Sequence, residues 1–178
     1  GEALPPEGEA LPPEGEALRV ALRRMASPVV VVTTEGARGP RGATIGSFTS
    51  VSLAPPLVSF NVTRRTQLHT ALAEASVFAV HLLAADQAAL AAHFALPDQS
   101  GAAQFAPFEH VRHAGRPPLL AGTLGVLVCR PAGRFEAADH TVMLGEVTEI
   151  VPGREDAPPL LYYAQSYRGV GEEVALGV

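Results

Sequence analysis

The stretch from Arg41 to Thr66 reads RGATIGSFTSVSLAPPLVSFNVTRRT, and it decides how the chain is interpreted. Its first half places small hydroxyl side chains between apolar residues, and these are Thr44, Ser47, Thr49, Ser50 and Ser52. Gly42 and Gly46 remove side chains where another backbone or a ring can approach closely. The stretch therefore predicts a strand surface that holds a flat, phosphorylated ligand.

A helix is predicted to begin at Thr66, which is a good N-cap residue. The apolar face of this helix consists of Leu68, Ala71, Leu72 and Ala75. Its free N–H groups and positive dipole end face back toward Arg64 and Arg65. Two interpretations stay open here: an anion site, or an ordinary capped helix beside two solvated arginines. The hydroxyl residues upstream favour the anion site.

The rest of the chain predicts a mainly β protein with a few short helices. One helix should begin at Glu16, bury Leu18, Ala21, Leu22 and Met25, and end at Ser27-Pro28. Another should be capped by Asp86 and end near Phe94. Strands are predicted over residues 28–34, 43–52, 57–62, 77–83, 119–129, 134–137, 141–151 and 160–163. Strands 43–52 and 57–62 should be antiparallel neighbours, and a hairpin should follow residue 34.

These strands, with three short helices, indicate an antiparallel barrel or sandwich. Residues 95–118 show little periodicity and form a loop long enough to cover a pocket. Residues 1–18 repeat the unit GEALPPE. The proline pairs Pro5-Pro6 and Pro12-Pro13 should block a helix and leave this segment extended. We therefore expect a tail over residues 1–15, one domain over residues 16–170 and a C-terminal tail over residues 171–178.

Composition excludes several classes of function. The 178 residues carry a net charge of −5 without a basic block, which argues against nucleic acid as a partner. All 13 cationic side chains are arginines, so no lysine can form a Schiff base. No apolar run is long enough to span a membrane, and no export signal is evident. Cys129 is the single cysteine and cannot form an intramolecular disulfide, so we expect a cytoplasmic protein. Cys129 itself is expected to be a core residue rather than a reactive thiol.

Common catalytic motifs are also missing. The sequence has no Gly-x-Ser-x-Gly elbow, no Gly-x-Gly-x-x-Gly fingerprint and no phosphate-binding Walker loop. Its histidines show no metal-ligand spacing, and His110 and His113 are expected on the surface. His140 beside Asp139 remains open: it is either a turn histidine that bonds its neighbour or a polar group at the mouth of a pocket.

Four segments together resemble the flavin reductase-like, FMN-binding split-barrel family. They are GATIGSFTSVSLAPPLVSFNV, RRT before a helix, ADHTVMLGEV and LLYYAQSYRGV, and they occur in the family's order over about residues 15–170. The resemblance implies a Greek-key split β-barrel that forms a homodimer and holds FMN or FAD near the dimer interface. It also implies NADH or NADPH as the hydride donor and a monooxygenase component as the recipient of reduced flavin.

The resemblance further implies roles for individual residues. Those beside the flavin ring are Thr44, Ile45, Gly46, Ser47, Phe48, Thr49 and Ser50. Those near the phosphate are Asn61, Thr63, Arg64, Arg65 and Thr66. His140 would contact the nicotinamide, and Tyr167 matches a C-terminal tyrosine of the family. Ala138 stands where many members have glycine, which makes nicotinamide binding less secure than flavin binding.

The predicted activity is hydride transfer from NAD(P)H to flavin, which requires stacked rings and excluded water rather than an acid or a base from the protein. Two alternatives remain. One is a flavin-binding or electron-transfer protein without catalysis, and the other is a barrel that dimerises without a cofactor.

Overall fold

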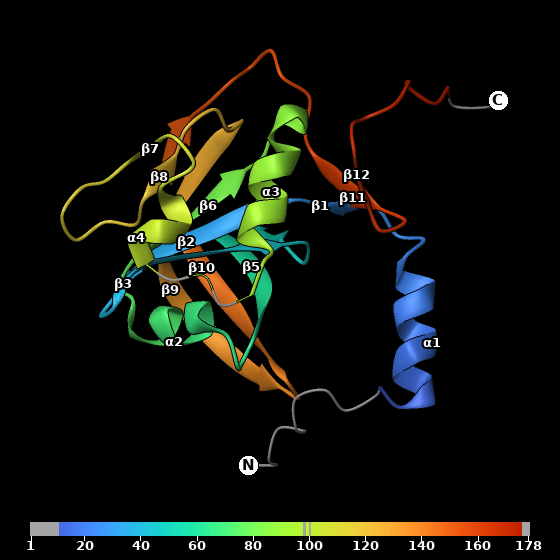
Figure 1. Cartoon of the computed structure of the whole chain (residues 1–178), viewed down its shortest axis with the longest axis horizontal. Helices are drawn as coiled ribbons and strands as arrows, with labels where there is room; N and C mark the ends of the chain where they lie inside the picture. The colour runs from blue at the N-terminus through green and yellow to red at the C-terminus, as the bar shows by residue number, and fades with distance from the viewer. Residues whose placement is uncertain (1–10, 98, 100, 176–178) are drawn as a thin grey trace.

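The computed structural model describes residues 11–97, 99 and 101–175. Its main element is an antiparallel sheet of seven strands in the order β3-β2-β6-β9-β10-β5-β4 (Figure 1). The strands are β2 (Val30–Gly36), β3 (Gly39–Ile45), β4 (Thr49–Leu53), β5 (Pro56–Thr63), β6 (Phe78–Leu82), β9 (Gly125–Ala137) and β10 (His140–Pro152). The mainly β architecture predicted from the sequence is confirmed.

Smaller elements complete the fold. A three-stranded sheet contains β1 (Ser27–Pro28), β11 (Leu161–Tyr163) and β12 (Ser166–Arg168), and a two-stranded one contains β7 (His110–Val111) and β8 (Leu119–Leu120). The helices are α1 (Pro13–Leu22), α2 (Gln67–Glu74), α3 (Ala88–Phe94), α4 (Gly101–Phe105) and the 3₁₀ turn η1 (Ala85–Gln87). Among the described residues no helix is both long and apolar enough to cross a membrane.

The connection between β3 and β4 forces the large sheet to curl. These strands are its two edges, yet only Gly46, Ser47 and Phe48 join them. In a flat sheet of seven strands the edges would lie roughly 29 Å apart, since neighbouring strands are about 4.8 Å apart. The four Cα steps from Ile45 to Thr49 span at most about 14 Å. The sheet therefore rolls up, and a seam forms where β3 approaches the end of β5.

Hydrophobic residues pack on both faces of β2, which explains its unbroken apolar sequence. Val30 and Val32 belong to the core inside the curled sheet, together with Phe60, Phe78 and Met143. Val29 and Val31 point the other way, into a second cluster whose other members include Leu83, Leu90, Phe94, Phe105 and Leu160. Helices α3 and α4 supply part of this second cluster, so they cover the outer face of the sheet.

Some predicted strands are confirmed and others are wrong in extent. The β2–β3 hairpin, β6 and the antiparallel β4–β5 pair are present. A single strand over residues 43–52 is wrong, because its first part belongs to β3 and its last part to β4. The strand over residues 119–129 is likewise divided into β8 and β9, because Gly122 adopts a positive φ of 73° and turns the chain. Residues 134–137 are the end of β9 rather than a separate strand.

The N-terminal helix differs from its prediction at both ends and in its burial. It ends at Leu22 rather than at Ser27-Pro28. It begins at Pro13, inside the predicted extended tail, because a proline in the first helical turn needs no hydrogen-bond acceptor. None of its residues is buried, so the predicted buried face of Leu18, Ala21, Leu22 and Met25 is wrong. In Figure 1 α1 lies apart from the sheet. Most of the repeated unit, residues 1–10, lies outside the described residues.

Of three further predictions, one is confirmed and two are wrong. Thr66 caps α2 as predicted, accepting a hydrogen bond from the N–H of His69 at 3.2 Å. Asp86 does not cap α3; it lies in η1 and forms an ion pair with Arg154. The segment 95–118 is not wholly irregular, because it contains α4 and β7.

Candidate functional site

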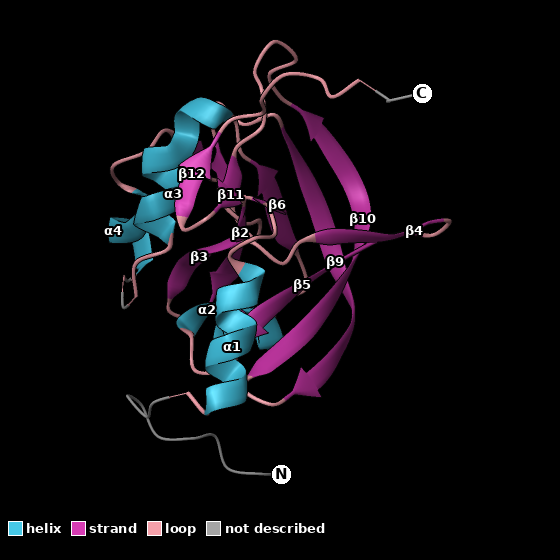
Figure 2. Cartoon of the chain, turned by 90° about the vertical axis from the view of Figure 1, so that its right-hand side faces the viewer, coloured by secondary structure: helices cyan, strands magenta, loops and turns pink. Residues whose placement is uncertain are grey.

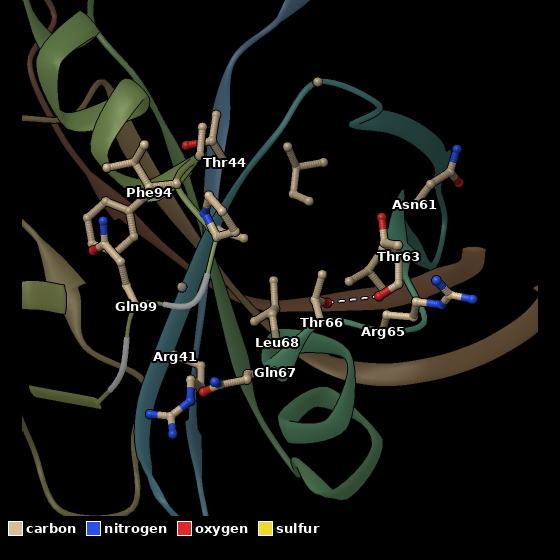
Figure 3. Close-up of a pocket in the computed structure, with 18 of the residues that line it drawn as sticks. Arg41, Thr44, Asn61, Thr63, Arg65, Thr66, Gln67, Leu68, Phe94 and Gln99 are labelled. Atoms are coloured by element: carbon tan, nitrogen blue, oxygen red, sulfur yellow. Dashed lines mark hydrogen bonds between the residues drawn. The ribbon is translucent and has the colours of Figure 1, made fainter. Parts of the chain in front are cut away.

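A cavity of about 650 Å³ opens at the seam of the curled sheet (Figure 3). Its walls come from β3 and the residues after it, the end of β5, the start of α2 and the segment after α3. The predicted site residues that line it are Thr44, Ile45, Gly46, Ser47, Asn61, Thr63, Arg65, Thr66 and His140. The fold thus gathers nine predicted residues from separate elements into one cavity.

Polar groups of β3 and β5 meet across the seam. The Ser47 hydroxyl accepts a hydrogen bond from the N–H of Asn61 at 2.9 Å. The Thr44 hydroxyl donates to the carbonyl of Ala91 in α3 at 2.6 Å. Part of the hydroxyl cluster therefore fixes the cavity walls, while the backbone around Gly46 stays exposed to a ligand.

The start of α2 forms a second wall with anion-binding character. The Thr66 hydroxyl donates to the carbonyl of Thr63 at 2.8 Å and accepts from the helix, so it holds the first turn in place. Gln67 and Leu68 follow it and also line the cavity. N–H groups in the first turn of a helix have no acceptor within the helix and can bind an anion. The exposed side chain of Arg65 adds a positive charge beside them.

Arg64 does not line the cavity, although the sequence predicted it as a phosphate ligand. Its guanidinium donates to the carbonyl of Ala138 at 3.2 Å, and its backbone N–H donates to the carbonyl of Asp139 at 2.9 Å. The carboxylate of Glu136 is 3.7 Å from the same guanidinium. Arg64 thus holds the turn between β9 and β10, while its neighbour Arg65 faces the cavity.

That turn presents His140 to the cavity. His140 is the first residue of β10 and pairs in register with Thr63 of β5. One ring nitrogen, Nδ1, is 2.8 Å from Oδ1 of Asp139, and the other, Nε2, is 3.1 Å from Oγ1 of Thr63. In the neutral ring, Nδ1–H donates to Asp139 and Nε2 accepts from Thr63. The hydrogen bond to His140 is the main cause that lowers the pKa of Asp139.

Ala138 adopts a turn conformation that favours glycine. Its φ of 49° lies in the left-handed region, where a side chain is strained and glycine is not. The turn between β9 and β10 is therefore formed with alanine at position 138. Arg64 bonds to the carbonyls of Ala138 and Asp139 and stabilises the turn.

The remaining predicted residues lie outside the cavity. Phe48 is partly buried against the inner core. Thr49 and Ser50 are exposed on the edge strand β4. Tyr167 lies on β12, where its ring packs edge to face on Tyr162 with centroids 5.3 Å apart. Their proposed roles would need a contact from beyond this chain.

Sequence reasoning missed one wall of the cavity, which the segment after α3 provides. Phe94, Leu96 and Gln99 line it without belonging to any motif. Gln104 of α4 fixes this wall through its side-chain amide. The amide oxygen accepts from the N–H of Gly42 at 3.0 Å, and the amide nitrogen donates to the Gly42 carbonyl at 2.8 Å. The only signal was the length of the loop at residues 95–118, which predicted a cover.

Two buried titratable side chains lie away from the cavity. The ring of His81 joins the carbonyl of Val31 and the N–H of Leu120, at 2.9 and 3.0 Å. Burial lowers the pKa of His81 to about 4. Cys129 is fully buried, as predicted, and burial raises the pKa of its thiol to about 12. The described residues contain no group of three histidine, cysteine or acidic side chains placed to hold a metal ion.

A family model described as a flavin reductase like domain matches residues 22–171. The chain belongs to this flavin reductase-like family. The match covers the whole curled sheet and the three-stranded sheet, so it confirms the family resemblance seen in the sequence.

Characterised members of the flavin reductase-like family align over most of the chain. A NADH:riboflavin 5'-phosphate oxidoreductase of Streptomyces pristinaespiralis is 41% identical over 151 residues, which is 84% of each chain. The reductase component of 4-hydroxyphenylacetate 3-monooxygenase of Thermus thermophilus is 38% identical and covers 83% of this chain and 91% of its own. The solved structure of the NADH:FAD oxidoreductase SgcE6 of Streptomyces globisporus, in complex with NAD and FAD fragments, superposes with a TM-score of 0.82. It is 33% identical and covers 94% of this chain and 100% of its own.

Proposed function

We propose that the protein is an NAD(P)H-dependent flavin reductase that binds FMN or FAD in the cavity at the sheet seam. The observation that carries this proposal is the meeting of three features in one cavity: the hydroxyl-rich end of β3, the start of α2 with Arg65, and the turn that bears His140. The names of the relatives, which are NADH-dependent flavin oxidoreductases, support the same activity.

The start of α2 is the proposed phosphate site. Free N–H groups of the first helical turn, the helix dipole and Arg65 all favour a dianion there. The hydrogen bonds of Thr66 fix the direction of the first turn, so the donors are placed before a ligand arrives. Arg65 is exposed, so it can adapt to a ligand at little cost.

The seam residues are the proposed ring site. Gly46 and the backbone beside Ser47 allow a planar ring to approach the main chain closely. Bound flavin would supply the redox chemistry, since it accepts a hydride from reduced nicotinamide. Backbone N–H groups at the seam would stabilise the negative charge that the ring gains.

His140 is the proposed nicotinamide contact. Its ring is held on both sides, by Asp139 and by Thr63, so it presents a fixed edge to the cavity. A histidine ring held in this way can position the nicotinamide over the flavin without transferring a proton. The geometry therefore fits hydride transfer better than acid–base catalysis.

Steady-state oxidation of NADH by the purified protein tests the proposed activity. Oxidation should depend on added FMN or FAD and should not occur without flavin. Flavin binding without turnover would instead indicate a flavin carrier, and absence of any flavin binding would overturn the proposal. Repeating the assay with NADPH identifies the preferred donor.

We also propose that the protein is a homodimer that passes reduced flavin to a monooxygenase component. Helix α1 has 10 residues and buries none of them, and isolated helices this short are marginal in water. Leu18 and Leu22, one turn apart on the same side of α1, and Met25, just after its end, are all about half exposed or more. A second copy that covers this apolar face would explain why the helix forms. A cytoplasmic location stays a prediction from the sequence.

A further inference from the structure

Arg41 is a buried arginine at the far end of the cavity. It lies on β3 and is only 9% exposed. Figure 3 shows it beside Gln67, on the side of the cavity opposite Arg65. The proposed phosphate site at Arg65 and Thr66 therefore leaves Arg41 unused.

The charge of Arg41 has no counterion among the described residues. Its guanidinium donates to the carbonyl of Pro40 at 2.7 Å, and no described carboxylate lies within 4.0 Å of it. By contrast, the exposed side chains of Arg112 and Arg130 each have a carboxylate partner. An arginine stays charged in a protein and offers five N–H donors. Among the described residues the guanidinium of Arg41 has one acceptor, the carbonyl of Pro40.

A buried charge is unfavourable unless it is paired, and within the part of the chain that the structure describes Arg41 has no carboxylate partner. An anion in the cavity would compensate its charge. The guanidinium fork matches the oxygens of a phosphate group, because it can donate two parallel hydrogen bonds. Gln104, which lies nearby, is already occupied by the backbone of Gly42. Arg41 is thus the group at this end that can select a charged ligand.

A second cavity of about 520 Å³ adjoins the first at this point. Arg41 and Gln67 line both cavities, so they mark the junction between them. A ligand that fills the first cavity and continues into the second must pass Arg41. A mononucleotide anchored at Arg65 has no phosphate left for this contact, whereas a dinucleotide has one.

We propose that Arg41 binds a further phosphate group of a dinucleotide, separate from the phosphate held at Arg65 and Thr66. This inference rests on the proposed function. Two sources share the chemistry: the adenylate half of FAD and the additional ribose phosphate of NADPH. In either case Arg41 determines which cofactor the protein prefers.

Binding of four ligands to the Arg41→Met variant tests the inference. Flavin fluorescence gives the Kd for FMN and FAD, and KM is measured for NADH and NADPH. The loss of a charge-assisted hydrogen bond should weaken FAD or NADPH by about tenfold or more. FMN should change by less than about threefold, since its one phosphate is held at Arg65 and Thr66. NADH should change as little, since it lacks the ribose phosphate by which NADPH would contact Arg41. Arg41→Lys should restore part of the affinity, and Arg112→Met controls for the loss of one positive charge.

A weaker affinity for FAD alone means that Arg41 binds the flavin cofactor. A higher KM for NADPH alone means that it binds the nicotinamide cofactor. An equal effect on all four ligands, or no effect on any, overturns the inference. Should Arg41→Met not fold, the Arg41→Lys and wild-type proteins are compared in the same way, and a selective loss is still expected. A wild-type protein that binds no flavin would refute the proposed function instead, so the two failures are distinguishable.

Discussion

Arg64 and Arg65 are adjacent in the sequence but belong to different parts of the site. Local sequence made both of them phosphate ligands, because both precede a helix. Both lie in the turn between β5 and α2, and of the two only Arg65 lines the cavity. Arg64 reaches the β9–β10 turn instead.

Separate substitutions should distinguish these two arginines. Arg65→Ala should weaken FMN binding by about tenfold or more, the cost of one charge-assisted hydrogen bond. Arg64→Ala should leave the Kd for FMN within about threefold and lower the rate of NADH oxidation, because the turn that carries His140 loosens. Fluorescence titration and steady-state kinetics measure the two effects. Equal weakening of FMN by both variants would contradict the assignment.

His140 provides a second contrast at this scale. His140→Ala should retain flavin and oxidise NADH more slowly. Its kcat should be lower and its KM for NADH higher. Asp139→Asn should have the same effect to a smaller extent, because it weakens the hydrogen bond that orients the ring. Stopped-flow reduction of bound flavin measures the step directly, and unchanged rates would remove His140 from the site.

Among the elements, β2, β6 and β8 are joined by the buried ring of His81. Its neutral form donates from Nδ1 to Val31 and accepts at Nε2 from Leu120. Protonation would remove the acceptor and place a charge in the core. Burial therefore lowers the pKa to about 4, against an ordinary value of 6.5.

The lowered pKa of His81 predicts how stability depends on pH. The unfolded chain takes up this proton near pH 6.5 and the folded protein near pH 4, so stability is full above 6.5 and falls as the pH decreases toward 4. The total loss should be on the order of 3 kcal/mol. Denaturant unfolding at several pH values measures it. His81→Gln should be less stable at pH 7, and its free energy of unfolding should not fall between pH 6.5 and 4 in this way. An equal dependence of the free energy of unfolding on pH in both proteins would refute the assignment.

Sequence periodicity predicted some elements well because their burial follows from local pattern. The buried face of α2 and the apolar run of β2 are examples. The break between β3 and β4 was missed, because Gly46–Phe48 continues the same alternation while crossing from one sheet edge to the other. The wall formed by Phe94 and Gln99 was also missed, since it depends on contacts between Gln104 and Gly42 that lie far apart in the sequence.

For the whole molecule, two exposed apolar surfaces are unexplained by a single chain. One is the face of α1 that contains Leu18 and Leu22, and the other is β4, where Leu53 is 90% exposed. In Figure 2 the β4–β5 hairpin projects from the sheet. Short edge strands with exposed apolar side chains are open to pairing or packing with another chain.

Charges placed on α1 should weaken the proposed dimer. Leu18→Glu combined with Met25→Glu puts one carboxylate on the apolar face of α1 and another just after the helix end. The protein should then sediment as a monomer at concentrations where the wild type is dimeric. Arg19→Gln, on the same helix, should leave the dimer intact. Analytical ultracentrifugation measures both. A wild-type protein that is monomeric throughout would refute the dimer.

The burial of Cys129 makes the molecule convenient for single-site labelling. Its thiol is the sole one in the sequence, it is fully buried, and its pKa is raised to about 12, so almost no thiolate forms at neutral pH. A maleimide should leave the native protein unmodified, as intact-mass spectrometry can verify. A cysteine introduced on the exposed β4–β5 hairpin would then carry a dye alone, and its emission could follow the arrival and departure of flavin in real time.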